Sequence, residues 1–258
     1  MGVFLSVLLF LWLPLAAPIY LLGRDPNLVS ILTIALLYGE FIFLVRFWGK
    51  HVYRQPQMLR RYGLARTRRN GFDLLRGLSI GIIALLSLFW LERWLGWLVW
   101  QAPPVFLPQV ILEGLIVALG IGFAEELFFR GWLLDELQRD YPLRMALWGN
   151  SFLFALLHFI KPLPEIMRTW PQFPALLLLG LALVWAKRRG GSRLGLPIGL
   201  HAGLVWGYYI INVGQLVEYS GQVPSWITGV DRNPLAGVMG LLFLSVIAFW
   251  MRRKGRLL

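Results

Sequence analysis

The feature that most constrains the fold is a series of long apolar runs that recur along almost the whole chain. Hydrophobic residues make up 58% of the 258 positions, and the mean hydropathy is +0.65. Uninterrupted runs of this kind are typical of membrane spans rather than of the amphipathic helices of a soluble globule. About eight runs lie near the ~20 residues that cross a bilayer as a helix: 3–22, 28–49, 73–99, 107–134, 145–160, 173–187, 195–213 and 235–251. We therefore predict an all-α, polytopic transmembrane helix bundle.

The distribution of basic residues predicts how this bundle is oriented. The chain carries 25 Lys and Arg against 13 Asp and Glu, a net charge of +12. If alternate loops lie on opposite sides of the bilayer, all but five of the 25 fall on one side. By the positive-inside rule that side is cytoplasmic, and both termini lie there. Topology and the anionic headgroups of the lipid bilayer thus account for the excess charge, and we expect no nucleic-acid partner. The five exceptions are Arg24, Arg93, Lys161, Arg168 and Arg232.

No polar connection is long enough to fold by itself, so we predict a single integral membrane domain over residues 1–258. It divides into N-terminal helices (1–106), a central core (107–213), and a C-terminal helix with a basic tail (214–258). Residues 1–22 lack the basic start of a signal peptide, which predicts a retained first helix. The chain has no cysteine, and hence no disulfide or thiolate nucleophile. An inner, plasma or thylakoid-type membrane fits equally well.

The stretch GIGFAEELFFRGWLLDEL places charge where an apolar run ends. Glu126 and Arg130 are four residues apart with the acid first, the favourable direction for an ion pair on a helix. Glu125 lies about 100° further round the helix and lacks that partner. A lone carboxylate at membrane depth has the properties of a general base. The sequence is equally consistent with two glutamates that only bridge neighbouring helices.

Two of the three histidines, His158 and His201, lie in apolar runs, whereas His51 lies in a basic loop where we expect it to be solvated. A single histidine in a helix is more often a packing hydrogen-bonder than a ligand. Together with Glu125, however, the two imidazoles form a set that is expensive to bury without a function. Two further intramembrane acids, Glu40 and Glu113, suggest no chemical role.

Three motifs in this order resemble the CPBP family of intramembrane proteases, which includes the prenyl-protein CAAX endopeptidase and bacteriocin-immunity proteins. They are Glu125-Glu126-x-x-x-Arg130, Phe154-x-x-x-His158, and His201 near the start of a later helix. The resemblance covers about residues 107–213. It implies a glutamate-dependent endopeptidase that cleaves a membrane-associated protein or peptide from a cavity open to the cytoplasmic side.

Carried over by position, the resemblance gives each residue a role. Glu125 and His158 activate the attacking water, and His201 stabilises the oxyanion, while Glu126, Arg130 and Phe154 support the site. The family is often labelled a metalloprotease, yet its better-understood members favour a metal-free mechanism, so we expect no required cofactor. A zinc site on Glu125, His158 and His201 stays open as a second hypothesis.

One position departs from the family pattern. Four residues after its third-motif histidine the family usually has Asn or Asp, and this chain has Val205. Losing one oxyanion donor costs about 10²–10³ in rate in other enzymes. The departure favours a different function, that of a weakly catalytic or non-catalytic scaffold that binds a membrane-protein partner. The sequence also leaves open a serine protease, because Ser79 lies in a Gly-x-Ser-x-Gly sequence, and a transporter with a proton relay.

Overall fold

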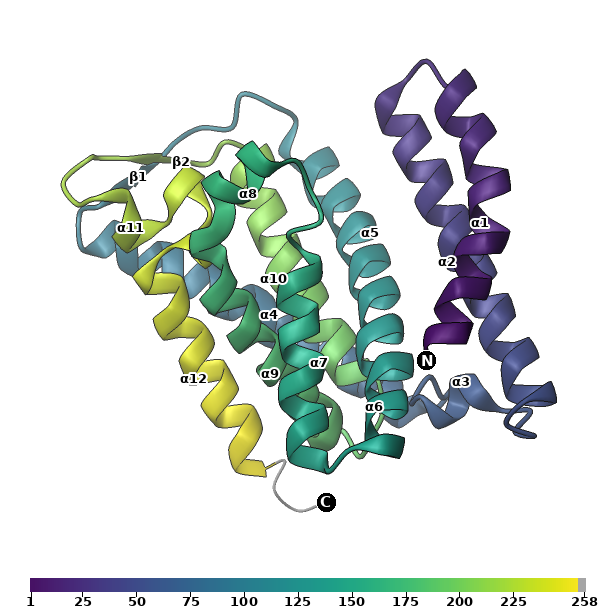
Figure 1. Cartoon of the computed structure of the whole chain (residues 1–258). Coiled ribbons are helices and arrows are strands. Elements are labelled where there is room, and N and C mark those ends of the chain that lie inside the picture. Colours follow the sequence, from purple (N-terminus) through teal and green to yellow (C-terminus); the bar gives the residue numbers. More distant parts are fainter. Residues whose placement is uncertain (255–258) are drawn as a thin grey trace. The chain divides into compact units, whose positions relative to one another are not determined.

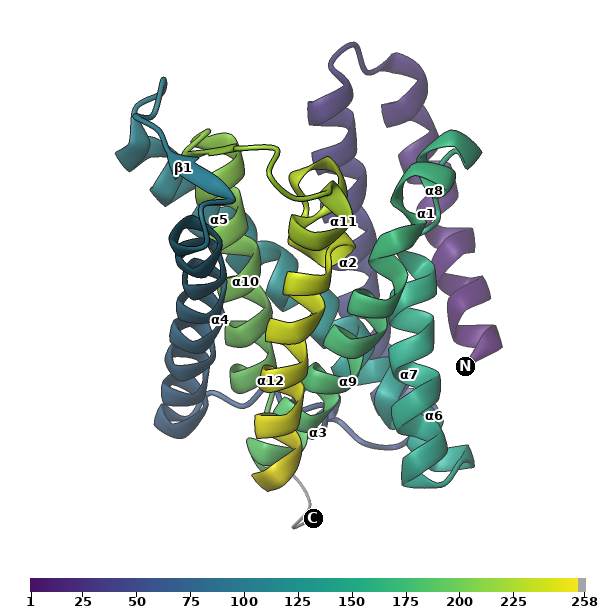
Figure 2. The same ribbon diagram turned by 90° about the vertical axis from the view of Figure 1, so that its left-hand side faces the viewer.

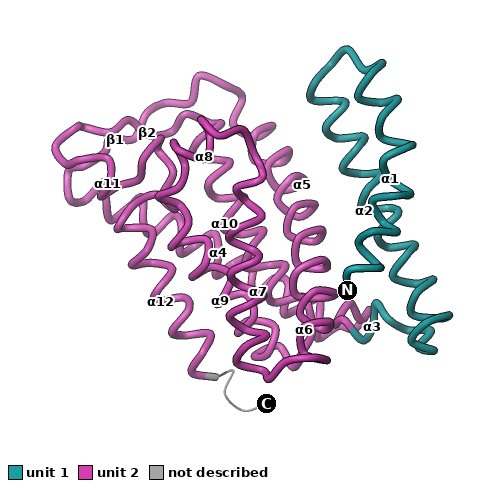
Figure 3. Tube along the Cα trace, in the orientation of Figure 1, with its two compact units in different colours: residues 1–61 teal, residues 62–258 magenta. Residues whose placement is uncertain are grey.

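The computed structural model describes residues 1–254, so residues 255–258 of the predicted basic tail lie outside the described residues. The chain divides into two compact units, Met1–Arg61 and Tyr62–Leu258 (Figure 3). Our prediction of a single membrane domain stays a prediction, and each unit is described by itself.

The first unit is a helical hairpin. It contains α1 (Gly2–Leu22), α2 (Pro26–His51) and the short α3 (Met58–Arg61). Asp25 begins α2, because its carboxylate accepts hydrogen bonds from the backbone N–H groups of Asn27 and Leu28. The two long helices pack through the Phe4 ring, which lies edge-on against Phe41 of α2 with 6.0 Å between ring centres.

The second unit is a bundle of long helices with short elements at both ends (Figures 1 and 2). In Figure 1, β1, β2, α8 and α11 lie at the top and α6 lies at the bottom. The long elements are α4 (Arg68–Trp94), α5 (Leu107–Glu126), α7 (Leu143–Leu157), α9 (Phe173–Arg189), α10 (Gly195–Val213) and α12 (Val238–Lys254). The short ones are η1 (Leu127–Leu133), α6 (Leu134–Asp140), α8 (Leu163–Thr169), η2 (Trp170–Gln172), α11 (Ser225–Thr228), η3 (Val230–Arg232) and η4 (Pro234–Ala236).

The all-α, polytopic bundle is confirmed. Among residues 1–254, six helical stretches are long and apolar enough to cross a membrane: 2–22, 26–51, 68–94, 107–140, 163–189 and 195–213. Two further long helices are shorter than the usual span, since α7 has 15 residues and α12 has 17. The count of about eight spans and the cytoplasmic location of both termini stay predictions.

Glycines allow α4 and α10 to pack closely. A Cβ on Gly81 would lie 2.5 Å from the Leu200 carbonyl oxygen, and one on Gly203 would lie 2.3 Å from the Leu78 carbonyl oxygen. The Gly-x-Ser-x-Gly sequence of α4 therefore serves helix packing, as is common for small residues in membrane helices. Ser79 itself is exposed, and its hydroxyl donates to the Leu75 carbonyl of its own helix at 3.0 Å. It lies outside any strand-to-helix elbow of the kind that activates a nucleophilic serine.

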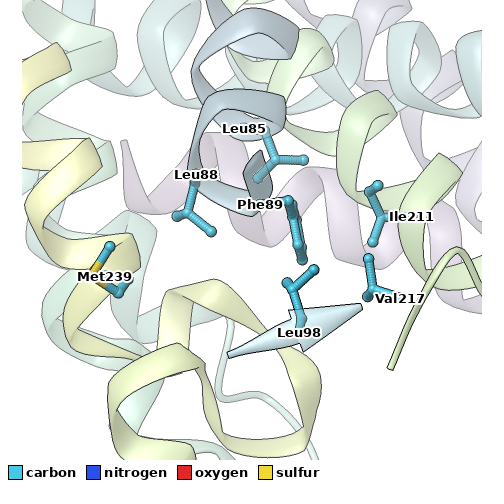
Figure 4. Packing of buried hydrophobic residues seen from close by; sticks show 7 residues of the cluster. All are labelled: Leu85, Leu88, Phe89, Leu98, Ile211, Val217 and Met239. Carbon is cyan, nitrogen blue, oxygen red and sulfur yellow. The ribbon is translucent and has the colours of Figure 1, made fainter. Parts of the chain in front are cut away.

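The end of the unit opposite α6 carries a small sheet that the apolar pattern did not predict. We expected a helix over 73–99, but α4 ends at Trp94 and Leu98–Trp100 forms β1. This strand pairs antiparallel with β2 (Val217–Tyr219), with Leu98 opposite Tyr219. Figure 4 shows the buried cluster beneath the sheet, to which α4, β1, α10, β2 and α12 all contribute: Leu85, Leu88, Phe89, Leu98, Ile211, Val217 and Met239.

Candidate active site

The first motif lies on a helix that changes its winding where the charges occur. The stretch 107–140 is helical throughout, but Leu127–Leu133 is a π-helix inserted between α5 and α6. Its wider turn is shown by the N–H of Leu134, which donates to the Phe129 carbonyl five residues back. Glu125 and Glu126 are the last residues of α5, so both acids lie directly before this turn.

Glu126 and Arg130 form the predicted ion pair across the boundary of the turn. Arg130 Nη1 lies 2.9 Å from Glu126 Oε1, and both side chains are fully buried. Arg130 Nη2 also donates to the Gly180 carbonyl of α9 at 3.3 Å. The same carboxylate oxygen of Glu126 lies 3.0 Å from Nδ1 of His201. The pair therefore connects the first motif to α9 and to the third motif on α10.

His158 and His201 converge on Glu125 from two other helices. His158 follows the last turn of α7, and its Nε2 lies 3.8 Å from Glu125 Oε2. His201 lies in the second turn of α10, and its Nε2 lies 4.0 Å from the same oxygen. The structure thus brings together the three residues predicted to be catalytic. Their roles stay predictions, because a distance alone assigns none.

Hydrogen bonds on the far side of each ring orient the two imidazoles. Nδ1 of His158 lies 2.7 Å from the Phe154 carbonyl, and Nδ1 of His201 contacts the Glu126 carboxylate. Carbonyl and carboxylate oxygens only accept, so both Nδ1 atoms are donors and carry hydrogen. In a neutral ring Nε2 is then an acceptor. Glu125 Oε2, which has no hydrogen-bond partner among residues 1–254, therefore faces two further acceptor atoms.

The Phe154 ring contacts the arginine and both histidines. The ring is fully buried, and the Arg130 guanidinium carbon lies 4.1 Å from the ring centre, the geometry of a cation–π contact. The ring centres of His158 and His201 lie 4.6 and 6.1 Å away. The supporting role of Phe154 stays a prediction.

Glu125, His158 and His201 line a cavity of about 300 Å³ inside the second unit. Most of its wall is apolar and comes from α4, α9, α10 and α12, with Leu85, Leu88, Leu176, Leu204, Leu244 and Ile247 among the lining residues. Val205 lies in this wall one turn beyond His201, so the departure from the family pattern falls inside the cavity. Three uncharged polar side chains, those of Gln172, Tyr208 and Asn233, also face it, and no sequence motif pointed to them.

Two further polar residues near the site were missed in the sequence. Asn150 is fully buried, and its Nδ2 donates to the Phe129 carbonyl at 2.7 Å. Lys187 is 8% exposed, and its Nζ donates to the Arg130 carbonyl at 2.5 Å. Asn150 could have been found, because it lies four and eight residues before Phe154 and His158 on one helical face. Lys187 could not, because it begins the basic run KRR at a helix end.

The distances between the predicted ligand atoms are longer than a zinc site requires. Zinc bonds to N and O ligands at about 2.0–2.2 Å, so tetrahedral ligand atoms lie about 3.3–3.6 Å apart. The Nε2 atoms of His158 and His201 lie further than this from Glu125 Oε2, at 3.8 and 4.0 Å. Within the described residues no group of three or more His, Cys, Asp or Glu side chains is arranged to hold a metal ion. The absence of a required cofactor stays a prediction.

Comparison with known proteins gives one match. The family model of type II CAAX prenyl endopeptidase Rce1-like proteins matches residues 107–207. Residues 107–207 thus resemble the Rce1-like proteins. The resemblance to the CPBP family is thereby confirmed, and the segment contains all three motifs, from Glu125 to His201. No curated protein and no solved structure matches the chain. At the family level, the Rce1-like match and the apolar helices indicate a CAAX-type protease and an integral membrane protein.

Proposed function

We propose that this protein is an intramembrane endopeptidase that hydrolyses a peptide bond of a membrane-associated protein or peptide. The observation that carries the proposal is the convergence of Glu125, His158 and His201 on one largely apolar cavity within an Rce1-like segment. Glu125 is 25% exposed although its neighbour Glu126 is fully buried, so the two acids occupy different environments. Glu126 is held by Arg130, and Glu125 is the carboxylate that faces the cavity.

The hydrogen-bond pattern supports a water-activating mechanism. A water molecule between Glu125 Oε2 and His158 Nε2 would donate one hydrogen bond to each atom, since both accept. In the proposed step Glu125 takes a proton from this water, and the water oxygen attacks the carbonyl carbon of the substrate. The carbonyl π bond opens, and its electron pair becomes the oxyanion of a tetrahedral intermediate.

We propose that His201 stabilises that oxyanion through a proton on Nε2, which the ring takes from solvent before the reaction and keeps throughout it. The ring then bears a positive charge, which the Glu126 carboxylate compensates through Nδ1 at 3.0 Å. In the second step the intermediate collapses, the C–N bond breaks, and the proton held by Glu125 passes to the leaving amine nitrogen. The net reaction consumes one water and leaves the site in its starting state.

The cavity wall supports an apolar substrate group that arrives from the lipid bilayer. Aliphatic side chains from five helices line it, and hydrogen-bonding residues are few. Such a wall gains free energy by burying apolar surface, at roughly 25 cal/mol per Å². We propose that the partner is a membrane-associated protein or peptide.

The proposal requires no cofactor, and a metal chelator is expected to leave activity unchanged. Zinc analysis of the purified protein, together with cleavage in excess chelator, tests this point. A stoichiometric zinc ion whose removal abolishes cleavage would instead establish a metalloprotease.

The experiment that tests the proposed function is cleavage of transmembrane peptides by the purified protein in detergent, with products identified by mass spectrometry. We expect cleavage by the wild type and none by Glu125→Gln or His158→Ala. The matched control is Glu113→Gln, which changes an exposed carboxylate on the same helix that accepts a hydrogen bond from Gln109. Cleavage by Glu125→Gln at the wild-type rate would refute the mechanism.

Val205 in the cavity wall favours one second candidate, a scaffold that retains the protease fold. Its apolar side chain supplies no donor to an oxyanion, and removal of one such donor elsewhere costs about 10²–10³ in rate. A wild-type protein that cleaves nothing and co-purifies in equal amounts with another membrane protein would support the scaffold. Cleavage that is abolished by Glu125→Gln would exclude it.

A further inference from the structure

The π-helical turn in the first motif receives two side-chain hydrogen bonds from other helices. Asn150 of α7 donates to the Phe129 carbonyl, and Lys187 of α9 donates to the Arg130 carbonyl, at 2.7 and 2.5 Å. Phe129 and Arg130 are consecutive residues in the middle of the turn. The two donors thus hold the same piece of backbone from two directions.

Burying the two donors costs hydration free energy, which their hydrogen bonds to the π turn must offset. A charged group taken out of water loses several kcal/mol of hydration unless it is paired and hydrogen-bonded. Lys187 meets this cost through the Arg130 carbonyl and the attraction of Asp135 and Glu126. The two basic residues that follow it, Arg188 and Arg189, lie nearer the surface. Lys187 is therefore the one residue of the run KRR that is turned into the bundle.

The backbone that these donors hold also fixes the geometry of the site. Glu125 and Glu126 immediately precede the π turn, and Arg130 lies in it. The number of residues per turn sets the angle between Glu126 and Arg130 around the helix, and π-turns are a common means of re-aiming side chains at functional sites. If the π turn became a regular α-helix, the residues before it would rotate about the helix axis relative to the residues after it.

We propose that Asn150 and Lys187 are positioning residues that stabilise the π turn and so aim Glu125 at His158 and hold Glu126 against His201. The inference rests on the proposed function for its kinetic part only. Neither residue lines the cavity, so their effect on a substrate is indirect.

The test compares Lys187→Met with Lys187→Arg, which keeps a donor, and with Asn150→Leu. We expect Lys187→Met and Asn150→Leu to lower kcat by about 100-fold, the cost of a misplaced catalytic group, with KM unchanged because the cavity wall is intact. Lys187→Arg is expected to recover part of kcat. The matched controls are Arg188→Met, which removes a donor to the Leu143 carbonyl, and Ser151→Ala, which removes a donor to Leu147. Both are expected to keep the wild-type kcat.

A spectroscopic readout separates this inference from the protease proposal. The chain has three histidines, so ¹⁵N-histidine labelling gives one set of ring signals each for His51, His158 and His201. We expect Lys187→Met to shift the Nδ1 signal of His201, which contacts Glu126, and to leave His51 unchanged. This holds even if the protein cleaves no peptide.

Two results would overturn the inference. One is a His201 signal and a kcat in Lys187→Met that equal those of the wild type. The other is a loss of kcat in Arg188→Met as large as that in Lys187→Met, which would mean that the effect comes from general packing of α9. If Lys187→Met does not fold, Asn150→Leu carries the same test, since both bonds are proposed to be needed to hold the turn.

Discussion

The buried ion pair between Glu126 and Arg130 allows a quantitative test of how the site is held. Both side chains are fully buried, and Arg130 contributes a 2.9 Å ion pair, a hydrogen bond to the Gly180 carbonyl and a cation–π contact with Phe154. Arg130→Met removes all three and leaves the Glu126 carboxylate buried without its main compensating charge. Breaking a buried pair in this way typically costs about 3–5 kcal/mol in the free energy of unfolding.

A double-mutant cycle shows whether the cost arises from the unpaired charge. Glu126→Gln in the background of Arg130→Met removes that charge, so the double variant is expected to be more stable than the sum of the two single losses predicts. The interaction energy of contacting residues lies at about 0.5–3 kcal/mol, and a fully buried pair is expected near the upper end.

The assay is reversible unfolding in mixed detergent micelles, followed by circular dichroism. The chain offers a control with the same spacing on the same continuous helix, since Arg139 lies 2.9 Å from Asp135 with 27% and 17% of the side chains exposed. Arg139→Met is expected to cost less than about 1 kcal/mol, as surface pairs do. The pair would not be a buried, coupled element of the site if Arg130→Met lost no more stability than Arg139→Met. The same would follow if the losses of the two single variants simply added up in the double variant.

Three further predictions concern particular contacts. Val205→Asn adds a donor one turn beyond His201 and is expected to raise kcat for peptide cleavage by up to about 100-fold, whereas an unchanged kcat would mean that another group already supplies the donor. Gly203→Ala is expected to destabilise the fold by about 1–3 kcal/mol in the same unfolding assay, because its Cβ would lie 2.3 Å from the Leu78 carbonyl, whereas Gly120→Ala, with nothing within 4 Å, is not. Burial and then the Glu92 charge raise the pKa of the Tyr219 phenol. The free energy of unfolding that the neutral phenol contributes is therefore present below about pH 10 and is lost as pH rises. Tyr219→Phe is expected to lack that alkaline loss above about pH 10, and equal slopes of unfolding free energy against pH in the wild type and the variant would contradict it.

The helices could be predicted from the sequence because burial in lipid requires continuous apolar surface. The segment 195–213 has the bounds of α10, and 28–49 lies within α2. The β1–β2 pair could not, because three-residue strands are too short to establish an alternating pattern. The end of α4 at Trp94 could not be predicted either, since the apolar composition continues into β1.

The site was predictable as a set of residues but not as a geometry. Paired acids, an arginine four residues on and two histidines in apolar runs identified the side chains. The π turn escaped prediction because its stabilising donors, Asn150 and Lys187, come from helices far along the chain. Sequence spacing within the first motif describes a regular α-helix, and only contacts with α7 and α9 show that the helix widens there.

The cleavage rate of one transmembrane peptide by Glu125→Gln and Glu113→Gln in parallel tests whether Glu125 activates water for peptide hydrolysis. The substitutions are identical and lie on the same helix, but Glu125 faces the cavity and Glu113 is exposed. We predict no detectable cleavage by Glu125→Gln and the wild-type rate for Glu113→Gln, with both proteins folded. Equal rates for the two variants would contradict the account.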